Sequence, residues 1–147
     1  MSSPGLRLRR GKKTPETTAL QAIIRMITLK GYLWLEPGEF RRFTPSQAAT
    51  IAAGRGLKGI AWRSNTGGAS DDRNQFVLFG VPGHPDITLL KVSPDRHAFH
   101  WIGLEVKGMG GRLNENQERF HALVNGMTTM PSIYVVTQPI DLEEILG

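Results

Sequence analysis

The order of helical and extended patterns in this 147-residue chain predicts an α/β fold, a mixed β-sheet flanked by helices. A helical stripe of apolar residues comes first, short extended runs follow, and a helix, a strand and a short helix close the chain. The apolar fraction is 39%, with three Trp and six Phe, which is enough for one packed core. No internal repeat or heptad pattern is visible.

The first helix is predicted between Thr14 and Gly31. Thr14 can cap it, Pro15 suits its first position, and Glu16 suits the positive end of the helix dipole. The apolar stripe consists of Leu20, Ile23, Ile24 and Ile27. Glu16 falls on this stripe, where a carboxylate aimed at the core is unfavourable unless it is paired or binds a metal ion. The alternative is a frayed first turn in which Glu16 only complements the dipole.

The remaining elements follow from turn residues and periodicity. Extended runs are predicted at 32–35, 57–63, 76–79, 86–91, 97–107 and 132–137, and helices at 44–52, 114–125 and 139–146. A loop rich in Gly, Ser, Asn and Asp is predicted at 64–74. The turn at 93–96 is consistent with pairing of the strands on either side of it. In the second of these strands, one face carries Trp101, Gly103, Glu105 and Lys107, and the other carries Ile102, Leu104 and Val106.

Charge is distributed unevenly along the chain, whose net charge is +5. Residues 1–60 hold eleven Lys and Arg against three acids, whereas residues 61–147 hold seven against ten. Residues 1–13 are interpreted as a flexible basic arm that could bind nucleic acid, with a disordered tail as the alternative. The stretch 36–58 is interpreted as an insertion with a basic face for DNA or a partner chain, formed by Arg41, Arg42, Arg55 and Lys58. A solvated surface helix is the alternative there.

Several function classes are excluded. The chain has no cysteine, so disulfides, zinc–thiolate sites and thiol nucleophiles are absent, and a reducing cytosol is the default compartment. No apolar run is long enough to span a bilayer, and the basic N-terminus lacks the hydrophobic region of a secretory signal. The four histidines lack metal-ligand spacing, no serine has a G-x-S-x-G setting, and 108–111 is not a phosphate loop.

Two carboxylates and a lysine on adjacent predicted strands form the main candidate site. Asp86 follows Pro85 at the head of one strand and Glu105 lies within the next, so the two converge if the strands pair. Lys107 leaves the same strand face as Glu105 and can orient or deprotonate an attacking water. The side chain of Val106 points into the core, which leaves its carbonyl available as a ligand. Mg²⁺, bound by such oxygens, supports phosphodiester hydrolysis. Glu-x-Lys spacing is common on solvated strands, but the apolar flanks here indicate burial.

Gln117 has two interpretations. Asn114-x-x-Gln117 is a capping-box pattern, in which the glutamine side chain accepts a hydrogen bond from the N–H of the capping residue. Gln117 also shares a helix face with Leu113, Phe120 and Val124, the face expected to pack on the sheet. An inward amide in this turn can touch a phosphate or a metal-bound water. The pattern alone favours capping.

Three stretches around the site, GVPGHPD, HWIGLEVKG and GRLNENQERFHALV, resemble the VRR-NUC branch of the PD-(D/E)xK nuclease superfamily. TPETTALQAIIRMI and WRSNTGG are similar to the family's first helix and following strand, so the resemblance covers 14–30 and 61–137. It implies a restriction-endonuclease-like core and a single nuclease domain at 14–147. Within that core it makes Glu16 the helix carboxylate, Asp86 and Glu105 metal ligands, Lys107 the catalytic lysine and Gln117 the glutamine that completes the site.

The resemblance also implies an activity. It indicates a deoxyribonuclease dependent on Mg²⁺ or Mn²⁺, a hydrolase acting on ester bonds, with Glu16 and the Val106 carbonyl as further metal ligands. The chain is similar to small stand-alone bacterial and phage members, which resolve four-way (Holliday) junctions as homodimers in the cytoplasm of the bacterial or phage-infected cell. The length of 36–58 departs from the family pattern. The expected DNA contacts are Arg7, Arg9, Arg10, Lys12, Lys13, Arg63 and Arg112.

Two other functions remain open at this level. A nuclease that processes flaps or linear ends would use the same residues. A non-catalytic nucleic-acid-binding module would keep the fold without the chemistry, but the intact acidic set argues against it, because a degenerate site is expected to lose at least one member.

Overall fold

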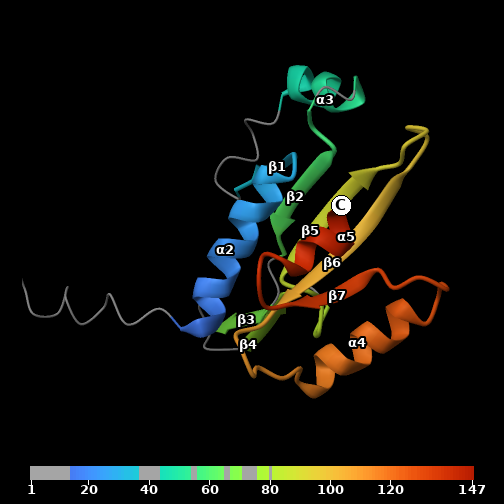
Figure 1. Ribbon diagram of the computed structural model, residues 1–147. Coiled ribbons are helices and arrows are strands. Elements are labelled where there is room, and N and C mark those ends of the chain that lie inside the picture. Colours follow the sequence, from blue (N-terminus) through green and yellow to red (C-terminus); the bar gives the residue numbers. More distant parts are fainter. Residues whose placement is uncertain (1–13, 37–43, 54–55, 65–66, 71–75, 80) are drawn as a thin grey trace, which may run out of the picture.

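The computed structural model describes residues 14–36, 44–53, 56–64, 67–70, 76–79 and 81–147 (Figure 1). The elements are α2 (Pro15–Leu29), β1 (Tyr32–Leu35), α3 (Pro45–Ala52), β2 (Gly59–Arg63), β3 (Gly67–Ser70), β4 (Phe76–Phe79), β5 (Ile87–Val92), β6 (Phe99–Val106), α4 (Glu115–Asn125), β7 (Ile133–Val136) and α5 (Asp141–Leu146).

The main sheet has five strands in the order β1-β2-β5-β6-β7. β1 and β2 are parallel, β5 is antiparallel to both β2 and β6, and β6 and β7 are parallel. The predicted α/β class with a mixed sheet and flanking helices is therefore confirmed, and the arrangement is compatible with a restriction-endonuclease-like core. The antiparallel β5–β6 pair confirms that the turn at 93–96 joins neighbouring strands.

Capping residues in the sequence determine where α2 and α4, the two helices that matter most for the site, begin. The side chain of Thr14 accepts a hydrogen bond from the N–H of Thr17 at the start of α2, and Pro15 occupies the first helical position. Asn114 and Gln117 form a complete capping box at the start of α4, and Gly126 ends that helix. Both helices begin where the sequence predicts them.

The core lies between the sheet and the α2–α5 layer. Its most buried members come from both helices and from all five strands of the sheet: Ile23, Ile27, Leu142, Leu146, Tyr32, Ala61, Ile87, Leu89, Leu104, Val106 and Val136, each no more than 2% exposed. Burying a side chain of this kind stabilises the fold by about 1.5–3 kcal/mol. Figure 1 shows α4 beside β7 and apart from α2. α4 covers the opposite sheet face, because its buried His121 contacts Glu105, whereas the neighbours Leu104 and Val106 lie in the core.

One predicted element is wrong in part. The stretch 64–74 was expected to be a loop, but Gly67–Ser70 forms β3 and pairs antiparallel with β4. Its Gly-Gly-Ala-Ser sequence has low β-propensity, whereas its partner β4 has the sequence FVLF, which is typical of a strand. The basic arm at 1–13 and three arginines of the proposed basic face, Arg41, Arg42 and Arg55, lie outside the described residues. In the part that is described, no helix is both long and apolar enough to cross a membrane.

Candidate metal centre

Asp86 lies immediately before β5 and is attached to the strands on both sides. Its backbone carbonyl accepts a 2.7 Å hydrogen bond from the N–H of Ser64, just after β2. Its side-chain Oδ2 accepts a 2.8 Å hydrogen bond from the N–H of Val106, at the end of β6. Continuing the antiparallel register of β5 and β6 by one position places Asp86 opposite Glu105. The structure therefore brings together the two predicted carboxylates.

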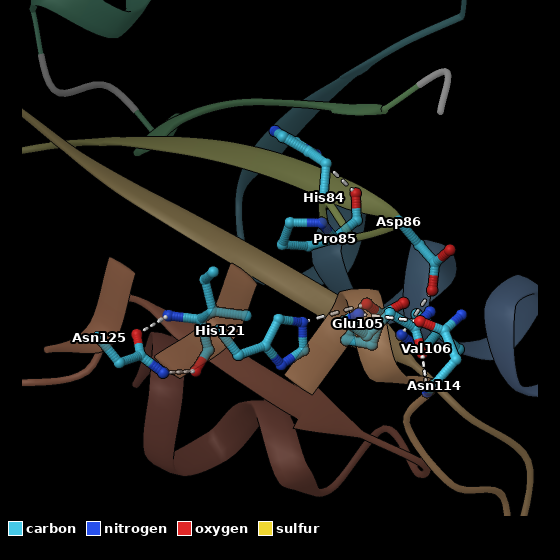
Figure 2. Close-up of polar contacts among 10 residues, drawn as sticks. His84, Pro85, Asp86, Glu105, Val106, Asn114, His121 and Asn125 are labelled. Atoms are coloured by element: carbon cyan, nitrogen blue, oxygen red, sulfur yellow. Dashed lines mark hydrogen bonds and ion pairs between the residues drawn. The ribbon is translucent and has the colours of Figure 1, made fainter. Parts of the chain in front are cut away.

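Glu105 is fully buried, with 0% of its surface exposed. Its Oε1 lies 3.2 Å from Nε2 of His121 on α4. Figure 2 draws this contact between the two labelled residues. While both carboxyl groups are ionised, no described residue donates a hydrogen bond to the second carboxyl oxygen, Oε2. Burial, followed by a side-chain hydrogen bond with Asp86 that requires a proton on one of the two carboxyl groups, and by the charge of Asp86, raises the pKa of Glu105 to about 9. A buried carboxyl group with an unpaired oxygen beside a second carboxylate is unfavourable unless a proton or a cation joins them.

Val106 is the last residue of β6 and Lys107 directly follows it. The positive charge of Lys107 opposes the rise in the pKa of Glu105. Burial lowers the pKa of His121, and the charge of Lys107 lowers it further. Lys107 therefore lies close enough to both residues to interact with them electrostatically. The side chain of Val106 is 1% exposed and lies in the core, as predicted.

Glu16 lies at the edge of this centre. It lines a hollow of about 170 Å³ together with Asp86, Val106 and Arg63. Its charge also contributes to the raised pKa of Glu105, as the smallest of the causes. Glu16 lines the hollow, but the burial that its place on the apolar stripe indicated is wrong, because the residue is exposed. The reason is its place in the first turn of α2, before Ala19, the first buried residue of that helix.

Gly108 allows α2 to approach the centre. A Cβ added at this position would lie 2.8 Å from Cβ of Pro15 and 3.0 Å from the backbone nitrogen of Glu16. The absence of a side chain directly after Lys107 therefore lets the first turn of α2 pack against the end of β6. This contact links Glu16, which is distant in sequence, to the strand that carries Glu105.

Gln117 serves as a helix cap in the structure. Its Oε1 accepts a 2.9 Å hydrogen bond from the N–H of Asn114, and its own N–H donates to Oδ1 of Asn114 at 2.8 Å. The capping interpretation is therefore confirmed, and the site role implied by the resemblance stays a prediction. Gly83, in the loop before Asp86, has φ of +86°, and a Cβ there would lie 2.1 Å from the carbonyl oxygen of Asn116. This close approach places the loop against the start of α4.

A scan of protein-family models, a search of curated proteins and a search of solved structures each find no match to this chain. The function is therefore inferred from the geometry of the site and from the resemblance of the sequence motifs.

The oxygens of this centre suit a hard divalent cation. Mg²⁺ is typically held by one or two carboxylates, with water and substrate phosphate completing its shell. Asp86 and Glu105 supply two adjacent carboxylates, and the unpaired buried Oε2 of Glu105 is an oxygen in need of a partner. No cluster of three or more His, Asp and Glu side chains suited to a metal ion occurs within the described residues. Asp86 and Glu105 alone would leave most positions around such an ion to water and substrate.

His121 is the residue that sequence reasoning missed. Its spacing from the other histidines matches no metal motif and therefore predicts no role in the site. In the structure it contacts Glu105 directly. The available signal was its position four residues after Gln117, which puts both on the sheet-facing side of α4. His84 sits in the loop before Asp86, as expected, with its ring 5.5 Å from the ring of Phe120.

Two of the expected DNA-binding arginines can be placed. Arg63, at the end of β2, is exposed and lines the hollow beside Asp86. Arg112 is exposed in the segment between β6 and α4. The other five expected contacts, Arg7, Arg9, Arg10, Lys12 and Lys13, lie outside the described residues.

Proposed function

We propose that this protein is a metal-dependent DNA endonuclease that hydrolyses phosphodiester bonds and resolves four-way junctions as a homodimer. One observation carries the chemistry: the fully buried carboxyl group of Glu105 lies opposite Asp86 with one oxygen unpaired. The resemblance of the surrounding motifs to VRR-NUC nucleases supports the substrate class, the junction geometry and the homodimer.

Asp86, Glu105 and the carbonyl of Val106 would hold Mg²⁺ or Mn²⁺, with Glu16 as a further ligand at the edge. When bound, such an ion stabilises the negative charge that develops on the phosphate during hydrolysis. Lys107, which lies close enough to Glu105 to interact with it electrostatically, orients the attacking water, or accepts its proton when its own amine is neutral. Arg63, on the wall of the same hollow, attracts the phosphate backbone.

The test is cleavage of a labelled four-way DNA junction in Mg²⁺ by wild type and by Lys107→Ala. We expect the variant to lose cleavage by at least about 100-fold, within the range for loss of one acid–base group, while its junction affinity changes little. Lys91→Ala is the matched control, because it removes a lysine near the opposite end of β5. Cleavage by Lys107→Ala at the wild-type rate would overturn the assignment.

A panel of substrates tests the geometry separately. At fixed salt, four-way junction, flap, splayed-arm and linear duplex DNA are compared with one enzyme preparation, since salt alone changes affinity for all of them. Preference for the junction, with paired symmetric cuts, supports a homodimeric resolvase. Preference for flaps or ends replaces that assignment with the flap- or end-processing function. Salt-sensitive binding without metal-dependent cleavage of any substrate indicates a non-catalytic module.

A further inference from the structure

Both residues of the contact between His121 and Glu105 are buried. His121 is 7% exposed and Glu105 is 0% exposed, and Nε2 of the imidazole lies 3.2 Å from Oε1 of the carboxyl group. An ionised carboxylate only accepts hydrogen bonds, so with Glu105 ionised the bond requires the proton of a neutral imidazole to be on Nε2. In that form His121 donates to Oε1, whereas Oε2 receives no hydrogen bond from any described residue.

His121 is held in place by a helix that is anchored at both ends. The capping box of Asn114 and Gln117 fixes the first turn of α4. At the other end, Oδ1 of Asn125 accepts hydrogen bonds of 2.9 Å from the N–H groups of Ser132 and Ile133, and Nδ2 of Asn125 donates to the Ile133 carbonyl at 3.1 Å (Figure 2). A donor on a rigid element can fix the orientation of the carboxyl group that it contacts.

We propose that His121 is a positioning residue that holds Oε1 of Glu105 and leaves Oε2 as the one oxygen of this carboxyl group available to a divalent cation. The inference rests on the proposed metal-dependent function. It assigns to His121 no contact with the ion, the substrate or the reacting atoms. The role of His121 is to act through Glu105.

One-oxygen binding by Glu105 has a consequence for metal selectivity. Mg²⁺ requires near-octahedral geometry with few deviations, whereas Ca²⁺ accepts six to eight oxygens and takes carboxylates through one oxygen or two. A carboxylate restricted to one oxygen therefore favours Mg²⁺ over Ca²⁺. Without the His121 hydrogen bond, Glu105 is free to offer both oxygens, and this preference falls.

The experiment measures metal binding without DNA, using the full chain. Electron paramagnetic resonance of free Mn²⁺ gives the Mn²⁺ affinity, and displacement by Mg²⁺ and by Ca²⁺ gives theirs. For His121→Leu we expect Mn²⁺ and Mg²⁺ affinity to fall by about tenfold or more, the usual effect of removing a residue that supports a metal ligand. Ca²⁺ affinity is expected to change by less than about twofold, because bidentate binding compensates.

Two further variants make the result specific. His121→Gln keeps an N–H donor near the position of Nε2, and it is expected to restore most of the Mg²⁺ preference over Ca²⁺. Phe120→Leu disturbs the packing of α4 against His84, in the loop before Asp86, without removing the donor, and it is expected to leave the preference unchanged. An unchanged Mg²⁺-to-Ca²⁺ affinity ratio in His121→Leu overturns the proposal. So does an equal change of this ratio in Phe120→Leu, because that result assigns the effect to packing.

Asp86→Ala separates failure of this inference from failure of the proposed function. If Asp86→Ala loses Mn²⁺ binding while His121→Leu keeps the wild-type affinities, the metal centre stands and His121 has no positioning role. If Asp86→Ala binds Mn²⁺ as wild type does, the metal centre itself is wrong, and the role of His121 is overturned with it.

Discussion

The N–H of Val106 donates a 2.8 Å hydrogen bond to Oδ2 of Asp86, which joins the end of β6 to the start of β5. The bond lies between two positions expected to bind the same ion, the Asp86 carboxylate and the Val106 carbonyl. It also holds Asp86 beside Glu105, since Glu105 directly precedes Val106. One backbone contact therefore holds the Asp86 carboxylate beside the end of β6.

Two substitutions separate the structural and chemical roles of Asp86. Asp86→Asn keeps a carbonyl oxygen that can accept from the N–H of Val106, whereas Asp86→Ala leaves this N–H without its partner. Leaving a buried donor unpaired costs about 1–3 kcal/mol, so Asp86→Ala should be less stable than Asp86→Asn by that amount. Urea unfolding measures the difference. Equal stability of the two variants would show that this hydrogen bond contributes little.

Both Asp86 variants are expected to lose metal-dependent cleavage, because the amide carries no charge to hold a cation. Cleavage of the labelled junction in Mg²⁺ measures this. Activity in Asp86→Asn close to that of wild type would contradict a ligand role for the Asp86 carboxylate.

The raised pKa of Glu105 predicts a pH dependence of stability in the metal-free protein. Glu105 has a pKa of about 9 when folded, against an ordinary value of 4.5, because of burial and the neighbouring Asp86. Between these two values the folded chain binds more protons than the unfolded chain, so the stability that this group contributes falls as the pH rises. The contribution is fully present below about pH 4.5 and is lost as the pH rises through about 9.

Glu105→Gln removes this titration while keeping the shape of the side chain. With chelator present, the unfolding free energies of wild type and Glu105→Gln are compared from pH 5 to pH 9 by urea denaturation. We expect wild type to lose stability relative to the variant as the pH rises. Two curves that stay parallel over this range would contradict the raised pKa.

Sequence patterns predict those parts of the fold and site that depend on neighbouring residues. Thr14 and Asn114 bind backbone groups three residues ahead, so the starts of α2 and α4 could be predicted. The pairing of Asp86 with Glu105 follows from one short turn and strand alternation, and the burial of Glu105 follows from its apolar neighbours. These inferences need no knowledge of how distant elements pack.

The parts that sequence patterns do not predict depend on packing between distant elements. The contact of His121 with Glu105 requires a particular rotation and height of α4 on the sheet, which helix periodicity limits but does not fix. The exposure of Glu16 depends on how far α2 extends beyond the buried stripe. β3 has the sequence Gly-Gly-Ala-Ser, which contains no apolar alternation, so its pairing with β4 has no local signal.

Substitution of Gly108 tests whether function requires the close approach of the first turn of α2 to β6. A methyl group at this position would lie 2.8 Å from Cβ of Pro15 and 3.0 Å from the nitrogen of Glu16, so in Gly108→Ala the start of α2 must move away from the site. Overpacking of this kind typically costs about 1–3 kcal/mol. We expect the cleavage rate to fall by about tenfold or more, with less loss of DNA affinity, because Glu16 moves relative to Asp86.

Gly110→Ala is the matched control in the same loop. A Cβ at Gly110 meets no atom within 4 Å, although its φ of +76° disfavours alanine. This variant is expected to lose about 1 kcal/mol of stability through backbone strain, without displacing α2. Cleavage of the junction in Mg²⁺ and urea unfolding are measured for both variants. If the two lose stability equally but only Gly108→Ala loses cleavage, the approach of α2 to β6 matters for catalysis. If Gly108→Ala cleaves as wild type does, Glu16 does not need its observed position.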